Sequence, residues 1–275
     1  MKITFIGGGN MATALIGGLL KNGWSTGDVS VVEIDAGARA RLERDSGVAT
    51  YAEIAPAMGE VGCVVLAVKP QHMCGVARSL APLLGDSLVV SIAAGVRVGD
   101  LSRWLGGHRR IVRAMPNTPA LALAGMTGLY APATVAAADR SRAEQILAAA
   151  GRTLWVETEE RLDGVTAVSG SGPAYVFYFI ESLQRAAAQL GFDDRVARLL
   201  AIETFKGAAK LADESAESAA TLRAKVTSKG GTTERALNEL ENRGVSEAIV
   251  QAVRAAAERS RELGDAFGND NPKDS

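Results

Sequence analysis

The sequence predicts an α/β fold in two parts, an N-terminal Rossmann-like doubly wound sheet followed by an all-α C-terminal domain. Three observations lead to this prediction. From residue 1 to about residue 157, short apolar runs alternate with helical stretches, which is typical of a parallel sheet whose strands are joined by helices. A glycine-rich turn comes directly after the first apolar run. After about Leu162, helical patterns follow one another without an intervening strand pattern.

The expected strands are short. They are residues 2–6, 29–34, 63–68, 88–92, 111–115 and 153–156. Two of them, CVVLAV at 63–68 and LVVSI at 88–92, are nearly all apolar, as expected for strands that helices cover on both faces. The first helix should run from Asn10 to about Lys21 and end at Gly23.

The C-terminal part should consist of helices alone. Pro173 stands where a helix can begin, and residues 174–190 follow without a breaker up to Gly191. The AYVFYFI start of this helix is apolar all round, so it should be buried on every side. The next helix should begin at Asp193 or Asp194 as N-cap. It should direct Val196, Leu199, Leu200 and Phe205 inward, and further helices fit residues 233–241 and 246–263.

These patterns divide the chain into a dinucleotide-binding domain at 1–160, an all-helical domain at 161–265 and a flexible tail at 266–275. The tail is polar and rich in breakers from about Gly264. A helical domain of this size is too small to hide a fully apolar helix alone, so we expect a dimerisation domain that also binds the substrate. The alternative is that the apolar helix forms the centre of a monomeric bundle.

Composition excludes several classes of function. The formal net charge is −1 and the basic residues are scattered, so a nucleic-acid partner is not expected. No apolar run approaches the length of a membrane span, and the N-terminus has no signal-peptide core. Two cysteines, Cys63 and Cys74, make neither a disulfide framework nor a metal site, and Cys63 reads as a core residue. We therefore expect a cytoplasmic protein without a bound metal.

The glycine-rich turn at residues 7–12, GGGNMA, matches the pattern G-x-G-x-x-A between the first strand and the first helix. Gly7 would allow the tight turn, Gly9 would let the backbone approach a pyrophosphate, and Ala12 would let the helix pack closely on the sheet. The free N–H groups at the start of the helix would then meet phosphate oxygens. The glycine-rich turn therefore predicts a dinucleotide-binding site.

Acidic residues follow the second strand, where the adenosine ribose should lie. Glu33 and then Asp35 can accept hydrogen bonds from both ribose hydroxyls and repel a 2′-phosphate, which favours NADH. Arg39 and Arg41 come shortly after, and one of them could instead pair with a 2′-phosphate. The alternative for both arginines is a solvated helix face.

Five further segments are specific: AVKP at 67–70, SIAAG at 91–95, RAMPNTP at 113–119, SGSGPAY at 169–175 and TSKGGTT at 227–233. Together they closely resemble the pyrroline-5-carboxylate reductase family, in order from about residue 3 to 263, and MPNTP and GGTT are distinctive of it. The resemblance implies a Rossmann domain and an interlocked helical homodimer that often assembles further. It also implies reduction of pyrroline-5-carboxylate to proline by hydride transfer from NADPH or NADH, the last step of proline biosynthesis.

The resemblance and the physical chemistry of these segments together assign residues to the cofactor. AVKP and AAG stand at the carboxyl ends of strands, where open α/β sheets bind ligands. Lys69 can reach the ribose, although it could be a plain surface lysine. Asn117, held between two prolines, could bond the carboxamide or order the substrate loop, or could belong to a mere structural turn. The expected cofactor-binding residues are Ile6, Gly7, Gly8, Gly9, Asn10, Met11, Ala12, Glu33, Ala67, Val68, Lys69, Pro70, Ala93, Ala94, Gly95 and Asn117.

The GGTT segment precedes a helix, so its backbone N–H groups form a natural nest for the substrate's carboxylate. By resemblance, the carboxylate would be held by Ser228, Gly230, Gly231 and Thr232. Thr233 would be the catalytic residue, with its hydroxyl near the ring nitrogen, and Glu159 matches an acidic position near the family's substrate pocket. The alternative is that Thr232 or Thr233 only caps the helix.

No other catalytic group is expected. The imine can arrive already protonated, so positioning would matter more than acid catalysis. His72 and His108 both read as surface residues. A β-hydroxyacid or 6-phosphogluconate-type dehydrogenase would carry an acid/base lysine on the helix after residue 173, and none is present in its first turns. A non-catalytic dinucleotide sensor would not need the AVKP, MPNTP and GGTT segments.

Overall fold

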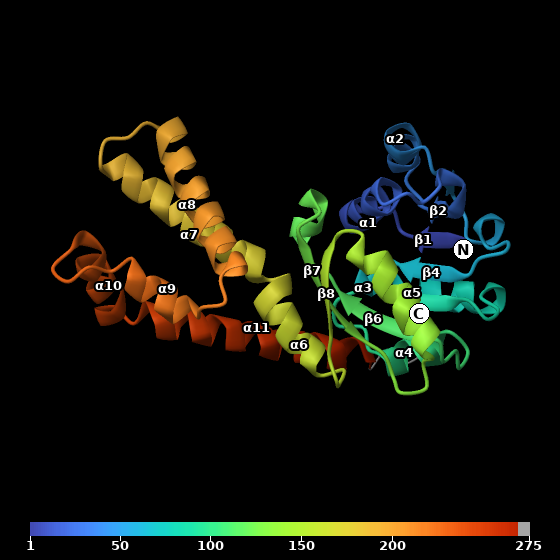
Figure 1. Cartoon of the computed structure of the whole chain (residues 1–275). Helices are drawn as coiled ribbons and strands as arrows, with labels where there is room; N and C mark the ends of the chain where they lie inside the picture. Colours follow the sequence, from blue (N-terminus) through green and yellow to red (C-terminus); the bar gives the residue numbers. More distant parts are fainter. Residues whose placement is uncertain (269–275) are drawn as a thin grey trace. The chain divides into compact units, whose positions relative to one another are not determined.

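The computed structural model describes residues 1–268 and contains two compact units (Figure 1). The first unit is Met1–Ser171 together with residues 256–268, and the second is Gly172–Ala255. The first unit contains β1 (Ile3–Ile6), α1 (Asn10–Lys21), β2 (Val29–Val32), α2 (Ala36–Ser46), β3 (Ala49–Tyr51), β4 (Cys63–Leu66), α3 (Pro70–Leu80), β5 (Leu88–Ser91), α4 (Val98–Trp104), β6 (Ile111–Met115), β7 (Gly125–Tyr130), α5 (Ala137–Ala148), β8 (Gly151–Trp155) and α6 (Arg161–Val165). The second unit contains α7 (Gly172–Gln189), α8 (Asp194–Glu214), α9 (Ala219–Lys225), α10 (Thr232–Asn242) and the start of α11 (Val245–Gly268).

The eight strands of the first unit form one sheet in the order β3-β2-β1-β4-β5-β6-β7-β8. All neighbours are parallel except β6 and β7, so β7 and β8 run opposite to the other six strands. The six expected strands are present, but β3 and β7 were not expected. β3 has only three residues, and β7 (GMTGLY) contains two glycines, which weaken a strand pattern.

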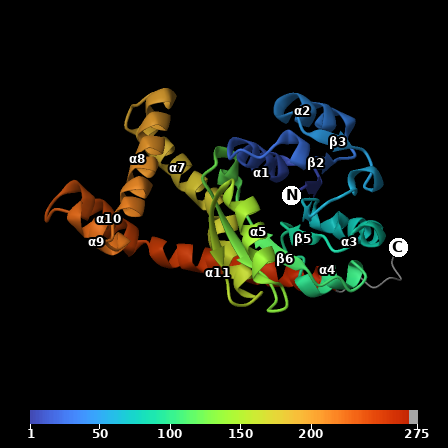
Figure 2. The ribbon, with the colours of Figure 1, turned by 45° about the vertical axis from the view of Figure 1, so that its right-hand side comes forward.

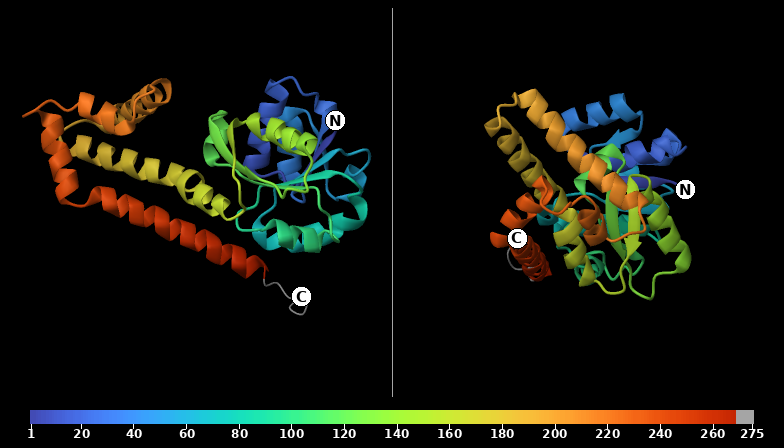
Figure 3. Two further views of the ribbon diagram at one scale, coloured as in Figure 1. Left: turned by 60° about the horizontal axis from the view of Figure 1, so that its bottom comes forward. Right: turned by 60° about the vertical axis from the view of Figure 1, so that its left-hand side comes forward.

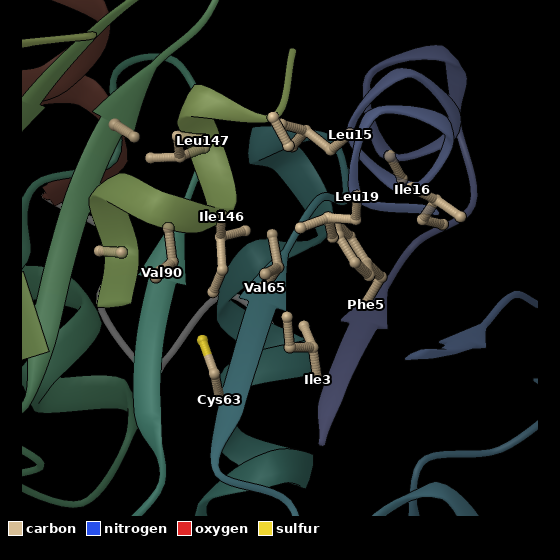
Figure 4. Close-up of a cluster of buried hydrophobic side chains, with 14 of the residues drawn as sticks. Ile3, Phe5, Leu15, Ile16, Leu19, Cys63, Val65, Val90, Ile146 and Leu147 are labelled. Carbon is tan, nitrogen blue, oxygen red and sulfur yellow. The ribbon is translucent and has the colours of Figure 1, made fainter. Parts of the chain in front are cut away.

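Helices cover both faces of this sheet, which confirms the doubly wound prediction. On one face, Phe5, Val65 and Val90 pack in a core cluster with Leu15 of α1 and Ile146 of α5 (Figure 4). The other face packs against α3 and α4, and β4 alternates its side chains between the two clusters. This double coverage is why the sequence of β4 is apolar at every position.

Cys63 is confirmed as a small core residue. It has no exposed surface and belongs to the cluster in Figure 4. Burial raises the pKa of its thiol to about 12, and the nearby Asp139 carboxylate adds to this. The thiol is therefore uncharged and inert at neutral pH.

The helical unit leaves its large apolar side chains exposed. In α7, expected to be buried on every side, no residue is buried, and Phe177 and Tyr178 are 64% and 66% exposed. Asp193 caps α8 as expected by accepting from the Val196 amide at 2.8 Å. However, Leu199 and Leu200 are exposed, and the buried residues of α8 are Ala197 and Ala201. The inward prediction for these leucines is wrong for a single chain, because α7 and α8 lie side by side in a unit too small to cover them (Figures 1 and 2).

The division between the units differs from the expected boundary at 160. α6 packs on β6 and β7, Leu162 is fully buried, and Gly170 lies against Met115 of β6, so the first unit continues to Ser171. The last part of α11 also belongs to this unit, and α11 remains helical to Gly268 (Figure 3). The tail was expected to be flexible from 266; residues 266–268 still belong to α11, and positions 269–275 lie outside the described residues. Among residues 1–268, no helix is long and apolar enough to cross a membrane.

Candidate active site

The carboxyl ends of four neighbouring strands meet at one edge of the sheet. Ile6 pairs with Val32 on one side and with Leu66 on the other, and Leu66 pairs with Ser91. Strands β2 and β4 flank β1 on opposite sides, so this edge is the point where the strand order reverses. The segments 7–12, 33, 67–70 and 93–95 all follow these strand ends. The fold therefore brings the expected cofactor residues of four separate loops to the place where such sheets bind dinucleotides.

The glycine-rich loop has the shape that a pyrophosphate needs. Gly7 has φ +105°, and a Cβ on it would lie 2.8 Å from the carbonyl oxygen of Ala67. A Cβ on Gly9 would meet nothing within 4 Å, so the loop is open at that position. Ala12 is 1% exposed, which allows α1 to pack closely. Gly9 is the N-cap of α1 and has no side chain to bond the first-turn amides, which remain available to an anion.

Glu33 is held in place by the backbone. Its Oε2 accepts from the Gly8 amide at 2.9 Å and its Oε1 accepts from the Asp35 amide at 3.0 Å. Asp35 caps α2 by accepting from the Ala38 amide at 2.6 Å. Glu33 thus connects the end of β2 to the glycine loop, and its charge stays at the position expected for the adenosine ribose.

Arg39 and Arg41, the two α2 arginines considered for a 2′-phosphate, lie in different surroundings. Arg39 donates from Nη1 to the carbonyl oxygens of Glu33 and Ile34 at 2.7 and 3.0 Å, so it braces the β2–α2 turn. Arg41 lines a pocket of about 310 Å³ between α1 and α2, together with Gly8. Arg41 is therefore the better placed of the two to meet a 2′-phosphate.

Asn117 is committed to the protein itself. It is 9% exposed, donates from Nδ2 to the carbonyl oxygen of Ser169 at 3.0 Å, and accepts at Oδ1 from the Met126 amide at 2.9 Å. Of the roles considered for it, loop ordering fits these contacts, because the amide has no free end for a nicotinamide carboxamide. Its side chain thus links the loop between β6 and β7 to residue 169 and to the start of β7.

Glu159 forms an ion pair inside the first unit. Its Oε1 accepts from Arg113 Nη1 at 3.0 Å and from the Val98 amide at 2.8 Å. Arg113 belongs to β6 and is 2% exposed. The carboxylate therefore neutralises a buried guanidinium and bonds the first turn of α4. These contacts give it a structural task, while its expected place near the substrate stays a prediction.

The GGTT loop lies in the helical unit and opens α10. Gly231 is the N-cap, so Thr232 and Thr233 are inside the first turn and neither is the cap. Two of the loop amides are already bonded: Gly230 donates to Glu234 Oε2 at 2.7 Å, and Gly231 donates to the Ser228 carbonyl oxygen at 3.0 Å. The first-turn N–H groups of Thr232 and Thr233 are among those that this leaves for a carboxylate.

The side chains around this loop also suit an anion. Gly230, Gly231 and Thr232 line an open depression with Arg235 and two further α10 residues, Ala236 and Glu239. Among residues 1–268, the Thr233 hydroxyl makes no hydrogen bond and Arg235 makes no ion pair. A hydroxyl, two amides and a guanidinium thus lie at one helix start, beside the carboxylates of Glu234 and Glu239. Thr232 and Thr233 were expected from the sequence, but Arg235 was not.

The histidines do not form a catalytic group. His72 is exposed as expected, whereas His108 is half-buried, and its Nε2 is buried without a partner among residues 1–268. Burial lowers the pKa of His108. In the same part of the chain, no group of three or more His, Cys, Asp or Glu side chains could hold a metal ion.

The family comparisons divide the chain in a similar way. The profile described as pyrroline-5-carboxylate reductase dimerisation matches residues 159–263. The profile described as NADP oxidoreductase, coenzyme F420-dependent, matches residues 2–95.

Individual relatives match over almost the whole length. A pyrroline-5-carboxylate reductase from Pseudomonas aeruginosa is 43% identical over 268 residues, which is 97% of this chain and 98% of the relative. The solved structure of a pyrroline-5-carboxylate reductase from Coxiella burnetii has a TM-score of 0.90 and 42% identity, covering 95% of this chain and 98% of that one. A pyrroline carboxylate reductase from Plasmodium falciparum, solved with NADP bound, has a TM-score of 0.86 and 28% identity, covering 96% and 98%.

Proposed function

The chain belongs to the pyrroline-5-carboxylate reductase family, and on that premise we propose that it reduces L-1-pyrroline-5-carboxylate to L-proline with NADPH or NADH. The observation that carries this proposal is the alignment with a reductase of that name over 97% of the chain at 43% identity. Each reactant has a proposed binding place: the cofactor at the point of the sheet where the strand order reverses, and the substrate at the start of α10.

The cofactor's binding residues are proposed from the geometry of the first unit. The pyrophosphate would lie over Gly9 and accept from the first-turn amides of α1. Glu33 would receive the adenosine ribose, and the segments 67–70 and 93–95 would line the nicotinamide half. When bound, the dihydronicotinamide supplies a hydride to the imine carbon.

The substrate's carboxylate is proposed to bind at the start of α10. The amides of Thr232 and Thr233 would donate to it, and the positive end of the helix dipole would add to the attraction. Ser228 would then shape the loop through its carbonyl bond to the Gly231 amide rather than hold the carboxylate by itself. This assignment keeps the expected loop and shifts the donating amides by one or two residues.

Thr233 is proposed as the catalytic residue because its hydroxyl is free to bond the ring nitrogen. The nitrogen carries the proton of the imine, so a hydroxyl oxygen can accept from it and orient the ring. Hydride addition turns the iminium into an amine, and no protein acid is required for that step. The protein's own work is positioning and hydrogen bonding.

A homodimer is proposed to be the working form. The matched dimerisation profile covers the helices whose large apolar side chains are exposed in one chain, among them Phe177 and Leu199. A second copy would cover this surface, which a monomer rarely leaves open. A cytoplasmic location is consistent with the two free thiols at Cys63 and Cys74.

The deciding assay follows the oxidation of NADH and NADPH by purified protein with pyrroline-5-carboxylate and without substrate, and the reduction of NAD+ and NADP+ with 6-phosphogluconate. We expect turnover only with pyrroline-5-carboxylate. Turnover with 6-phosphogluconate alone would replace the proposal by a hydroxyacid dehydrogenase. Cofactor binding without any turnover would leave a dinucleotide sensor.

A second experiment tests Thr233. The Thr233→Ala variant should lower kcat by about tenfold to a hundredfold, which corresponds to about 1.5–3 kcal/mol for a hydrogen bond to charge in the transition state. Cofactor affinity should change little, and Thr233→Ser, which keeps the hydroxyl, should recover most of the rate. Unchanged kcat and KM in Thr233→Ala would reduce Thr233 to a helix residue without a catalytic task.

A further inference from the structure

We propose that the C-terminal end of α11, residues 260–268, is a positioning element of the cofactor site that holds the loop at 93–95 in its working shape. This inference rests on the proposed function, because it assumes that this loop faces the nicotinamide half. The sequence shows no sign of it, since this end of the chain reads as the beginning of a flexible tail. All contacts that support it lie inside the first unit.

Small residues on one side of α11 make close approach possible. Ser260, Gly264 and Gly268 recur at every fourth position, so they lie on the same helix face. Ser260 and Gly264 are buried. A Cβ on Gly264 would lie 3.0 Å from the Arg97 guanidinium, and one on Gly268 would lie 3.1 Å from the Asp100 carboxylate. A larger residue at Gly264 or Gly268 would therefore require the end of the Arg97 or Asp100 side chain to shift.

Polar contacts then fasten the helix at both ends of this face. Asp163, which is 3% exposed, accepts from Ser260 Oγ at 2.7 Å and lies 3.5 Å from Arg97 Nη2. At the far end, Arg103 donates to the carbonyl oxygen of Gly268 at 3.0 Å and pairs with Asp100 at 2.9 Å. An arginine on the last carbonyl group of a helix satisfies an unpaired acceptor and complements the dipole. The end of α11 is therefore docked and not frayed.

Docking places two apolar side chains against the loop after β5. A Cβ on Gly95 would lie 3.2 Å from two ring carbons of Phe267 and 3.4 Å from Cβ of Leu263. Gly95 has φ +75°, a conformation that glycine adopts without strain, and the preceding Ala93 is 5% exposed. The Phe267 ring thus closes one side of the loop that is proposed to line the nicotinamide half. Without the ring, the loop would lose the neighbour that keeps it in this conformation.

The test separates the two halves of the cofactor. NADH and ADP-ribose share the adenosine and pyrophosphate parts, but only NADH has the nicotinamide. The dissociation constants of both are measured by titration for the unmodified protein, Phe267→Ala, Phe267→Leu and the control Arg261→Ala. Arg261 is on the same helix end, is 56% exposed in its side chain and, among residues 1–268, pairs only with Glu258. NADPH and 2′-phospho-ADP-ribose serve in the same way if the protein binds them more tightly.

We expect Phe267→Ala to raise the dissociation constant of NADH by roughly threefold to tenfold. In Phe267→Ala, the dissociation constant of ADP-ribose should change by no more than about twofold. Phe267→Leu should restore NADH binding, and Arg261→Ala should bind both ligands as the unmodified protein does. Equal weakening of NADH and ADP-ribose would mean general destabilisation and would overturn the inference, as would unchanged NADH binding. If Phe267→Ala does not fold, Ser260→Ala gives the same comparison, with a smaller expected shift. Turnover by the unmodified protein is measured separately, so a failure of the proposed function is seen independently.

Discussion

Glu33 should set the preference of this enzyme between NADH and NADPH. Its carboxylate accepts from the Gly8 and Asp35 amides at 2.9 and 3.0 Å, so it cannot turn away without losing two hydrogen bonds. A 2′-phosphate on the ribose that it faces would be a second negative charge at close range. The structure thereby removes one route, rotation of the carboxylate, by which the protein could accept NADPH easily.

The size of the effect follows from the distance and the surroundings. A carboxylate and a phosphate charge about 4 Å apart repel by about 1–4 kcal/mol at surface-like dielectrics. This corresponds to roughly fivefold to several-hundredfold in relative affinity. Arg41 can offset part of it from the pocket between α1 and α2, whereas Arg39 is occupied by the carbonyl groups of Glu33 and Ile34. We therefore expect NADH to be used at least as well as NADPH.

The assay compares kcat/KM for both cofactors at one ionic strength. In Glu33→Gln, which keeps the size of the side chain and removes its charge, the ratio should shift toward NADPH by about fivefold or more. Glu33→Ser should shift it in the same direction, and Arg41→Ala should shift it toward NADH. A large NADPH preference in the unmodified protein would refute the reasoning and assign the choice to the arginines. An unchanged ratio of kcat/KM between the two cofactors in Glu33→Gln would also refute the reasoning.

Three further predictions concern the rest of the molecule. Phe177→Arg, in the exposed apolar face of α7, should give a monomer in sedimentation and abolish turnover, because the proposed working form is the dimer; a fully active monomer would contradict this. Since burial raises the pKa of Cys63 to about 12, a thiol reagent at pH 8 should modify only the half-buried Cys74 in folded protein, and fast loss of both thiols would be the contrary result. Hydrogen bonds from Arg110 to Asp139 at 2.8 Å lower the pKa of that carboxyl. Arg110→Ala should therefore cost about 1–3 kcal/mol of unfolding free energy at pH 7. The difference should begin to shrink as the pH falls below about 4, where the carboxyl of the unfolded chain takes up a proton while that of the folded protein stays ionised, and it should vanish below the lowered pKa of the folded protein; denaturant titrations from about pH 7 to about pH 2 that show no such decrease would rule the pairing out.

Local sequence patterns predicted the parts of this protein that depend on neighbouring residues. Strand β4 could be recognised because all its residues are apolar, and a strand buried on both faces needs that. The glycine loop could be recognised because Gly7, Gly9 and Ala12 each meet a steric demand within six residues. Asp193 could be named as a cap because the amide that it accepts from, that of Val196, is only three residues further along the chain. The carboxylate after β2 followed from the same strand–turn–helix spacing.

Contacts between distant segments were decided by the tertiary structure alone. Glu159 was expected near the substrate from the family resemblance alone; the structure adds that it neutralises Arg113, which is 46 residues away and buried in the sheet. Asn117 looked available to the cofactor, but its partner Ser169 is 52 residues further on. The same holds for the end of α11, whose Ser260 reaches Asp163 across 97 residues and turns an apparent tail into a docked helix.

The physical reason is that periodicity and turn chemistry are properties of a short stretch of chain. Whether a polar side chain is free to bind a ligand depends, in contrast, on which buried charge or amide the packed fold places beside it. The sequence by itself therefore predicted the fold class, the family and the glycine-rich loop that is proposed for the cofactor. The tertiary structure decided which of the named side chains remain free to meet a ligand.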